Sequence, residues 1–302
     1  CKYYDFWFPP RNLSIGQSEH DKDEKDKQGT CASLNCFHKG IMAPFYRLVC
    51  CVQADGGGEK WKRVGDIWEE PKLFVNGIEA DDVAQGSLGD CWLIAAIAAC
   101  AQSNPETIKK IFISRTYSVC GYYKVKLFDI YKGYWRIFTV DDYIPVNASG
   151  QPRFSNSHDK ELWPIILEKA YAKMVGDYEH MDGGWMATAF KVFTGNTPVE
   201  ISQGKDDTNQ YTVTAKDGKA TKSNGLGNGK VGAVLNTVQL FNVLQGCIDH
   251  SFILAAGCFI KGEQSGPNKE TFNADTGLFG GHAYSILACY QAPNQPDAPR
   301  LV

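Results

Sequence analysis

The sequence predicts an α+β fold in which a helical first part precedes a β-rich second part, and three observations favour this class. Residues 91–100 are apolar on every face and rich in alanine, a pattern typical of a buried helix. Apolar residues also recur at helical spacing between residues 160 and 175. Residues 251–260 and 282–290, in contrast, have the β-type composition of strands. Because the pattern changes after residue 195, we expect the two parts to meet there.

The length and composition limit the classes of protein to consider. A chain of 302 residues corresponds to roughly two domains or subdomains. Its net charge of −3 argues against a nucleic-acid binder, which would need an excess of basic residues. The longest apolar run, residues 91–101, is too short to span a bilayer, so we expect no transmembrane helix. Eleven cysteines, an odd number without a dense framework, favour free thiols in a reducing compartment and a cytoplasmic location.

The first 60 residues show no regular periodicity, and we expect an irregular N-terminal segment there. Residues 21–27 form a run of mixed charge that is typical of a solvated loop. The chain opens with Cys1 and shows no signal peptide, so we expect it to be a fragment. Several cysteine and histidine residues could in principle bind zinc, but their spacing matches no regular zinc module, and we interpret them as ordinary residues. They are Cys31, Cys36, His38, Cys50 and Cys51.

The elements of the first part can be placed in order. Residues 85–90 contain two glycines and an aspartate, so we expect a turn in which Asp90 caps the helix that begins at residue 91. Residues 122–131 and 134–140 should form a hairpin around a Lys-Gly turn. Pro164 fits only the first turn of the helix near residues 160–175.

The second part begins with an unusual segment. Residues 203–230 are polar and hold five glycines, and we expect an exposed loop or insertion. The patterns as a whole predict three sections: an irregular segment 1–60, a helical section 61–195 and a β-rich section 196–302.

Cys91 is the strongest candidate for a chemically special residue. It lies at the predicted start of a buried helix, where unpaired backbone N–H groups and the helix dipole favour an anion. Such a position lowers the pKa of a cysteine and raises its thiolate fraction. A thiolate nucleophile also needs a base that later protonates the leaving amine, and histidine is the usual choice.

His282 is the best of the six histidines for that role. It follows Phe279-Gly280-Gly281 and begins a strand, so a glycine turn would bring its ring to the edge of a cleft. Four others lie in polar, turn-like surroundings and the fifth precedes a strand without special context: His20, His38, His158, His180 and His250.

Gln85 lies on the turn before Cys91. Its side-chain amide could donate to the substrate carbonyl oxygen beside the Cys91 backbone N–H, which together would form an oxyanion hole. A surface glutamine in a turn is the alternative interpretation.

Four motifs in order resemble those of one protease family. Gln-Gly-Ser-Leu-Gly-Asp-Cys-Trp-Leu-Ile-Ala-Ala at residues 85–96 resembles the catalytic-cysteine signature of the calpain family, papain-like cysteine proteases of the cytosol. Gly-His-Ala-Tyr-Ser-Ile at residues 281–286 resembles the family's histidine signature. Residues 140–145 and 167–173 are similar to its core segments, and Trp61-Lys62-Arg63 resembles the stretch leading into the core.

The resemblance implies a fold and a chemistry. The fold would be a papain-like core of two lobes, a helical first lobe and an antiparallel β-rich second lobe. The activity would be calcium-dependent cleavage of internal peptide bonds in protein substrates, through an acyl-enzyme formed by Cys91, with His282 as acid and base and Gln85 in the oxyanion hole. The positions that match the family's first-lobe calcium site are Val75 and Gly77, by backbone carbonyl, and Asp82 and Glu161, by carboxylate. Since two bare acids repel each other, we expect a cation to draw these carboxylates together.

The sequence also departs from the family pattern. The family's catalytic Asn follows the histidine in an Asn-Pro-Trp-Gly-like motif that is absent here, so we expect the chain to be truncated before it, beyond Val302. Asn294 is the nearest asparagine, but its Pro-rich surroundings favour a turn. No EF-hand loop is visible in these 302 residues, and whether a regulatory subunit or additional C-terminal domains belong to the protein is not readable from them. Two alternatives stay open: another papain-like Cys–His acyl transferase, and a catalytically silent binding module.

Overall fold

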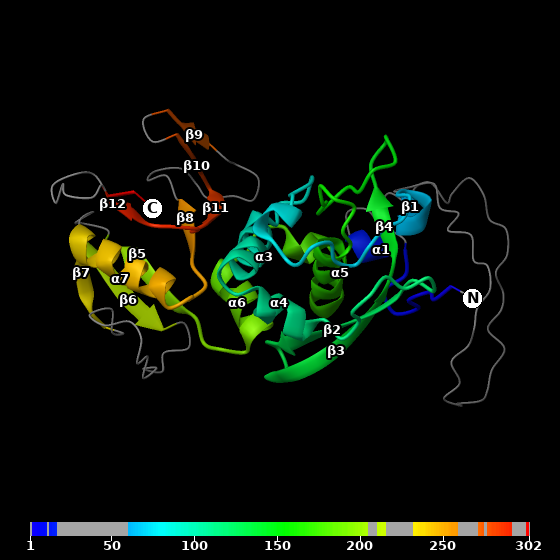
Figure 1. Cartoon of the computed structure of the whole chain (residues 1–302), viewed down its shortest axis with the longest axis horizontal. Helices are drawn as coiled ribbons and strands as arrows, with labels where there is room; N and C mark the ends of the chain where they lie inside the picture. Colours follow the sequence, from blue (N-terminus) through cyan, green and yellow to red (C-terminus); the bar gives the residue numbers. More distant parts are fainter. Residues whose placement is uncertain are drawn as a thin grey trace.

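The computed structural model describes residues 2–10, 12–16, 60–204, 210–215, 232–258, 271–274, 277–291 and 300–301. Helices and antiparallel strands alternate along these residues, so the fold is mixed α+β, as the sequence predicts (Figure 1). The zinc candidates of the N-terminal segment and Asn294 lie outside the described residues.

The described helices are α1 (Asn12–Ile15), α3 (Cys91–Ser103), α4 (Pro105–Ile111), α5 (Trp163–Val175), α6 (Met186–Thr194) and α7 (Thr237–Asp249), with short 3-10 turns η2 (Val64–Asp66), η3 (Ala80–Asp82) and η4 (Glu179–Met181). The described strands are β1 (Lys60–Arg63), β2 (Tyr122–Asp129), β3 (Tyr134–Asp141), β4 (Tyr143–Val146), β5 (Val199–Gln203), β6 (Gln210–Ala215), β7 (Val234–Asn236), β8 (Ala255–Cys258), β9 (Thr271–Asn273), β10 (Leu278–Gly280), β11 (His282–Ser285), β12 (Tyr290–Gln291) and β13 (Arg300–Leu301). None of the helices in these ranges has the length and apolar character needed to cross a membrane.

Helices α3 and α5 form the centre of the larger hydrophobic core. Nine of the thirteen residues of α3 are buried, which explains why its sequence is apolar on all faces. The two helices touch through the rings of Trp92 and Tyr171, whose centroids lie 5.6 Å apart. Pro164 lies in the first turn of α5, where its missing N–H costs nothing, as the sequence predicts.

The predicted hairpin is confirmed as β2 and β3. The strands pair antiparallel from Tyr122 opposite Asp141 to Asp129 opposite Tyr134. Every second residue of β2 is buried, so one face of the hairpin covers the larger core and the other faces solvent. Gly133 adopts φ +77° in the turn, a left-handed conformation that favours glycine.

The second part differs from the prediction in two places. The segment 203–230 is not only a loop, because β6 lies within it and pairs with β5 and β7 in a three-stranded sheet. Helix α7 was not predicted at all. Residues of this sheet and of α7 form a second, smaller hydrophobic cluster, which consists of Val213, Leu235, Val243 and Cys247.

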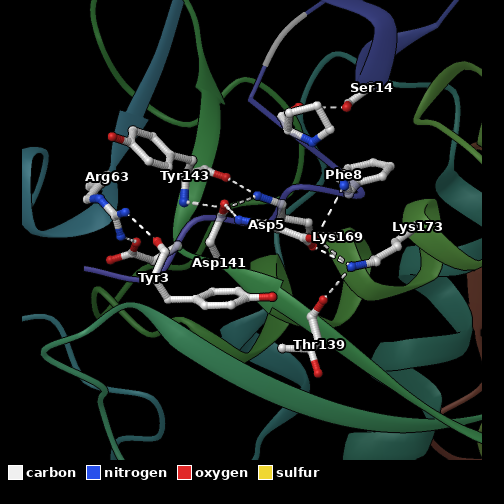
Figure 2. A network of polar contacts seen from close by, with 12 residues as sticks. Tyr3, Asp5, Phe8, Ser14, Arg63, Thr139, Asp141, Tyr143, Lys169 and Lys173 are labelled. Atoms are coloured by element: carbon white, nitrogen blue, oxygen red, sulfur yellow. Dashed lines mark hydrogen bonds and ion pairs between the residues drawn. The ribbon is translucent and has the colours of Figure 1, made fainter. Parts of the chain in front are cut away.

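The N-terminal residues 2–10 are tied to the larger core by buried charges (Figure 2). The backbone N–H of Asp5 donates to the Asp141 carboxylate at 2.7 Å, and the Asp5 carboxylate accepts from Lys173 at 2.6 and 2.7 Å. Lys169 binds the other oxygen of Asp141 at 2.5 Å, and neither side chain of this ion pair is exposed. Arg63 links Asp142 to the backbone carbonyl of Tyr3. Helix α5, strand β3 and the N-terminal residues are therefore held by one charged network.

Removing one partner of the Lys169–Asp141 pair should be costly. Lys169→Met leaves a carboxylate buried without its cation, so we expect a loss of about 3–5 kcal/mol in the free energy of unfolding, measured by urea denaturation. Lys109→Met is the matched control, because its ion pair with Glu106 is more than half exposed and should contribute less than about 1 kcal/mol. Equal losses in the two variants would contradict the interpretation of the network as buried.

Candidate active site

Cys91 is the first residue of α3, as predicted, and its side chain is half-buried. The backbone N–H groups of this first turn include those of Leu93 and Ile94, which both donate to the Asp90 carbonyl. The next residue fixes the helix start: the Trp92 indole donates to the Met181 carbonyl at 3.0 Å. A side chain at Gly184 would collide with the Trp92 ring, which therefore packs directly against backbone. The nucleophile candidate thus stands on a rigid support.

The turn before Cys91 is clamped to the segment 153–156. The backbones of Ala84 and Asn156 exchange two hydrogen bonds of 3.0 and 2.9 Å, and the Ser87 N–H donates to the Arg153 carbonyl at 3.0 Å. Gly86 is required here, because a Cβ atom at this position would lie 1.9 Å from the Phe154 carbonyl oxygen. Gln85 is exposed on this turn, and its amide donates to the Leu88 carbonyl at 2.9 Å.

His282 is the first residue of β11 and is half-buried. Gly281, at φ +75°, leads into the strand and donates its N–H to the Cys258 carbonyl at 2.7 Å. The Tyr284 ring lies edge-on to the imidazole, with centroids 5.0 Å apart. Its hydroxyl accepts from the Phe279 N–H at 2.8 Å, so Tyr284 fixes both the ring of His282 and the glycine turn before it.

Helix α3 and strand β11 pack against each other. The Ser285 hydroxyl donates to the carbonyl of Ala95 at 2.9 Å, and Ala283 packs against the larger core. The elements that carry the predicted nucleophile and the predicted base are therefore neighbours, although they lie far apart in the sequence. A thiol at a helix N-terminus with an imidazole on the adjoining strand can perform nucleophilic acyl transfer.

The other described cysteines provide a contrast. All six cysteines in the described ranges are free thiols. Cys100, on the same helix as Cys91, is fully buried, and burial raises the pKa of its thiol to about 12. It is thus suited to packing and not to nucleophilic attack.

Asp82 and Glu161 lie together, as the resemblance implies. The Trp163 indole donates to an oxygen of each, at 3.2 Å for Asp82 and 2.9 Å for Glu161. The second oxygen of Glu161 accepts from the Val75 N–H, and Asp82 also accepts from the Glu79 N–H at 2.7 Å. Burial, followed by the neighbouring Asp82 carboxyl, raises the pKa of Glu161 to about 7. The expectation that only a cation could draw these acids together was incomplete, because an indole N–H also bridges them.

The donor set at this position is suited to a hard cation. Two buried carboxylates lie side by side, and the Val75 N–H binds one of them, so the loop that contains Val75 and Gly77 lies against the pair. Backbone carbonyls of this loop would have to complete the oxygen ligands that calcium needs. Within the described residues, no group of three or more His, Cys, Asp and Glu side chains gathers for a metal, so such a site would depend on those backbone oxygens.

Sequence reasoning missed three residues of the site. Tyr284 and Ser285 position the strand of His282, and Trp163 bridges the two acids. The two-residue period of a strand could have placed Tyr284 on the face of His282. No local signal could have identified the Ser285–Ala95 or Trp163–Asp82 contacts, because each joins residues distant in the sequence.

The known proteins that this chain resembles are calpain-type cysteine proteases. The family model of the calpain family cysteine proteases matches residues 50–302. A calpain-type cysteine protease of Oryza sativa subsp. japonica is 32% identical over 235 residues, which cover 76% of this chain and 9% of that protein. The catalytic subunit of calpain-1 from Rattus norvegicus is 32% identical over 160 residues, which cover 53% of this chain and 22% of that protein.

The matches therefore span less than a quarter of these two relatives, while the family model spans most of this chain. On that match, and on the cysteine and histidine motifs it contains, the chain belongs to the calpain family of cysteine proteases.

Proposed function

We propose that the chain is the catalytic core of a calcium-regulated cysteine endopeptidase that cleaves internal peptide bonds of proteins. The observation that carries the proposal is the packing of α3, with Cys91 at its start, against β11, with His282 at its start. In this proposal the core has a papain-like arrangement of two lobes, residues 61–195 and 196–302. The two separate hydrophobic clusters support that division.

The first half of the reaction forms an acyl-enzyme. The Cys91 thiolate attacks the carbonyl carbon of the scissile peptide bond, and the carbonyl oxygen becomes an oxyanion. His282 then gives its proton to the leaving amine, the carbon–nitrogen bond breaks, and a thioester on Cys91 remains. In the second half, His282 takes a proton from water, which attacks the thioester and releases the new carboxyl terminus.

The oxyanion is stabilised by the turn that precedes α3. The Cys91 backbone N–H is one donor, and the Gln85 amide is the second. The clamp between residues 84–87 and 153–156 holds this turn in place. In the proposal, the Gln85 amide exchanges the Leu88 carbonyl for the substrate oxygen when substrate binds.

Val75, Gly77, Asp82 and Glu161 would hold calcium, which supplies positive charge between two carboxylates. The residues themselves connect the site to the catalytic turn: Asp82 belongs to η3, and Ala84, two residues later, begins the clamped turn with Gln85. A change in the position of Asp82 is thereby transmitted to the oxyanion donors through a short stretch of backbone.

Replacing the nucleophile should abolish proteolysis. Cys91→Ser in the full-length protein should remove nearly all peptidase activity on a casein substrate, because a hydroxyl is a poor nucleophile in a site built for a thiolate. Cys100→Ala, on the same helix, is the matched control and should retain activity, since that thiol is buried and fully protonated. An epoxide inhibitor of papain-like enzymes should modify Cys91. Activity that survives in Cys91→Ser would refute the assignment.

Removing the side-chain amide of Gln85 should lower the turnover number. We expect Gln85→Ala to lower kcat by roughly 10²–10³ with little change in KM, because the amide contacts charge that develops only in the transition state. Steady-state kinetics on a fluorogenic peptide measures both constants. A rise in KM with unchanged kcat would instead identify Gln85 as a ground-state binding residue.

Weakening the carboxylate pair should raise the calcium requirement. Asp82→Asn keeps an acceptor for the Glu79 N–H but removes a charge, so half-maximal activity should need calcium on the order of tenfold higher. Asp81→Asn changes the exposed neighbour and should leave the requirement unchanged. If a chelator has no effect on the activity of the unmodified full-length protein, the calcium proposal is wrong, whereas the protease proposal is unaffected.

A further inference from the structure

The side chain of Asp90 does not cap the helix that follows it. Asp90 is the N-cap residue of α3, but its carboxylate makes no capping hydrogen bond, and the first-turn N–H groups go to its backbone carbonyl instead. The side chain turns inward and is 1% exposed. A buried carboxyl group immediately before the nucleophile is unusual, because a cap at the surface would satisfy the same N–H groups at no cost of burial.

The Asp90 carboxyl meets a second buried carboxyl. Glu168 of α5, also 1% exposed, forms a side-chain hydrogen bond with Asp90. One Glu168 oxygen accepts from the Ser155 N–H at 2.9 Å. If both acids were ionised, Asp90 Oδ2 would find no N–H or O–H donor among the described residues. Two adjacent carboxyl groups can form a hydrogen bond only if one of them carries a proton.

We propose that Glu168 is a positioning residue, which keeps a proton and donates it to the Asp90 carboxyl, and so fixes the turn that presents Cys91. The inference rests on the proposed function in that it takes Cys91 as the nucleophile. The inference adds to that function a pair of buried acids, Asp90 and Glu168, next to Cys91. The net charge of this pair changes in the neutral pH range.

The surroundings determine how this pair titrates. Burial raises the pKa of Asp90 to about 7, although the hydrogen bond from Glu168 acts in the opposite direction and lowers it. Burial and then Asp90 raise the pKa of Glu168 well above its usual range. The other titratable groups that act on the pair are Asp182, whose charge also raises the pKa of Asp90, and the buried phenol of Tyr178. As pH rises through about 7, Asp90 therefore becomes negative while Glu168 keeps its proton.

A negative charge on Asp90 should make Cys91 less reactive. The charge lies one residue before the thiolate and repels it, which lowers the thiolate fraction. For charges on adjacent residues inside a protein, a repulsion of this kind changes the thiolate fraction by roughly several-fold. Below pH 7 Asp90 is protonated and the repulsion is absent, so the pair favours the thiolate on the acid side of neutrality.

The test is the rate at which iodoacetamide alkylates Cys91 in the full-length protein, followed by mass spectrometry of the peptide that contains Cys91. The unmodified protein, Glu168→Gln and Asp90→Asn are compared at about pH 6 and about pH 8.5, and the rates are expressed relative to the unmodified protein. The ratio cancels the pH dependence of alkylation that the proteins have in common. Glu106→Gln, an exposed change in the same part of the molecule, is the control and should give a ratio of one at both pH values.

The two variants should behave differently. In Glu168→Gln the amide donates in place of the protonated carboxyl, so Asp90 ionises at nearly the same pH and the rate ratio should stay close to one at both pH values. In Asp90→Asn the charge is absent, so alkylation should be equal at about pH 6 and several-fold faster at about pH 8.5. A purely structural role would change the rate equally at both pH values.

Each other outcome overturns the inference in a recognisable way. If Cys91 reacts faster than the remaining cysteines but the ratio for Asp90→Asn does not depend on pH, the positioning role is wrong and the proposed function stands. If Cys91 is not the preferred thiol at any pH, both fail. Should a variant not fold, the unmodified protein decides, because its infrared spectrum at about pH 8.5, where Asp90 and Glu161 are ionised, must still show the band of a protonated carboxyl group. A spectrum without that band overturns the inference.

Discussion

The buried ion pair between Lys169 and Asp141 is the constraint on which the other parts of the site depend. It fixes the position of α5 against strand β3, and the N-terminal residues close over it through Asp5. Two functional positions on α5 then follow from that placement. Trp163, at the start of the helix, bridges Asp82 and Glu161, and Glu168, beside Lys169, reaches the turn before Cys91. A slip of α5 by one turn, about 5.4 Å, would misplace both.

The turn at residues 84–87 and the proposed calcium residues are thus joined by backbone segments that pack tightly together. Gly86 lies against the backbone of Phe154, and Asn156 of the same segment pairs with Ala84. Glu161 follows that segment within a few residues. Since backbone contacts of this kind leave no room for side-chain adjustment, a displacement near the acids would move the proposed oxyanion donors with it.

The sequence was informative where the signals are local. The helix at Cys91, the hairpin and the helix with Pro164 follow from periodicity and turn residues, and all three are found. The direction of Asp90 could not be predicted, because a local capping preference competes with a partner, Glu168, that lies on a different helix. Strand β6 could not be predicted because its composition is polar. It is a strand because it pairs with both β5 and β7 and buries Val213. Helix α7 buries only three side chains, too few for a clear pattern.

The contact between Ser285 and Ala95 joins residues 190 positions apart, so the parts of the candidate active site are synthesised at very different times. During synthesis the chain emerges from its N-terminus, and the core around α3 and α5 can pack from residues that precede position 195. Long-range pairings of this kind form late, because the entropy of closing the intervening loop must be overcome first. A growing chain therefore carries the thiol of Cys91 for many seconds without its imidazole partner. Under the proposed function, the order of translation itself would keep the nascent protein from cleaving its neighbours.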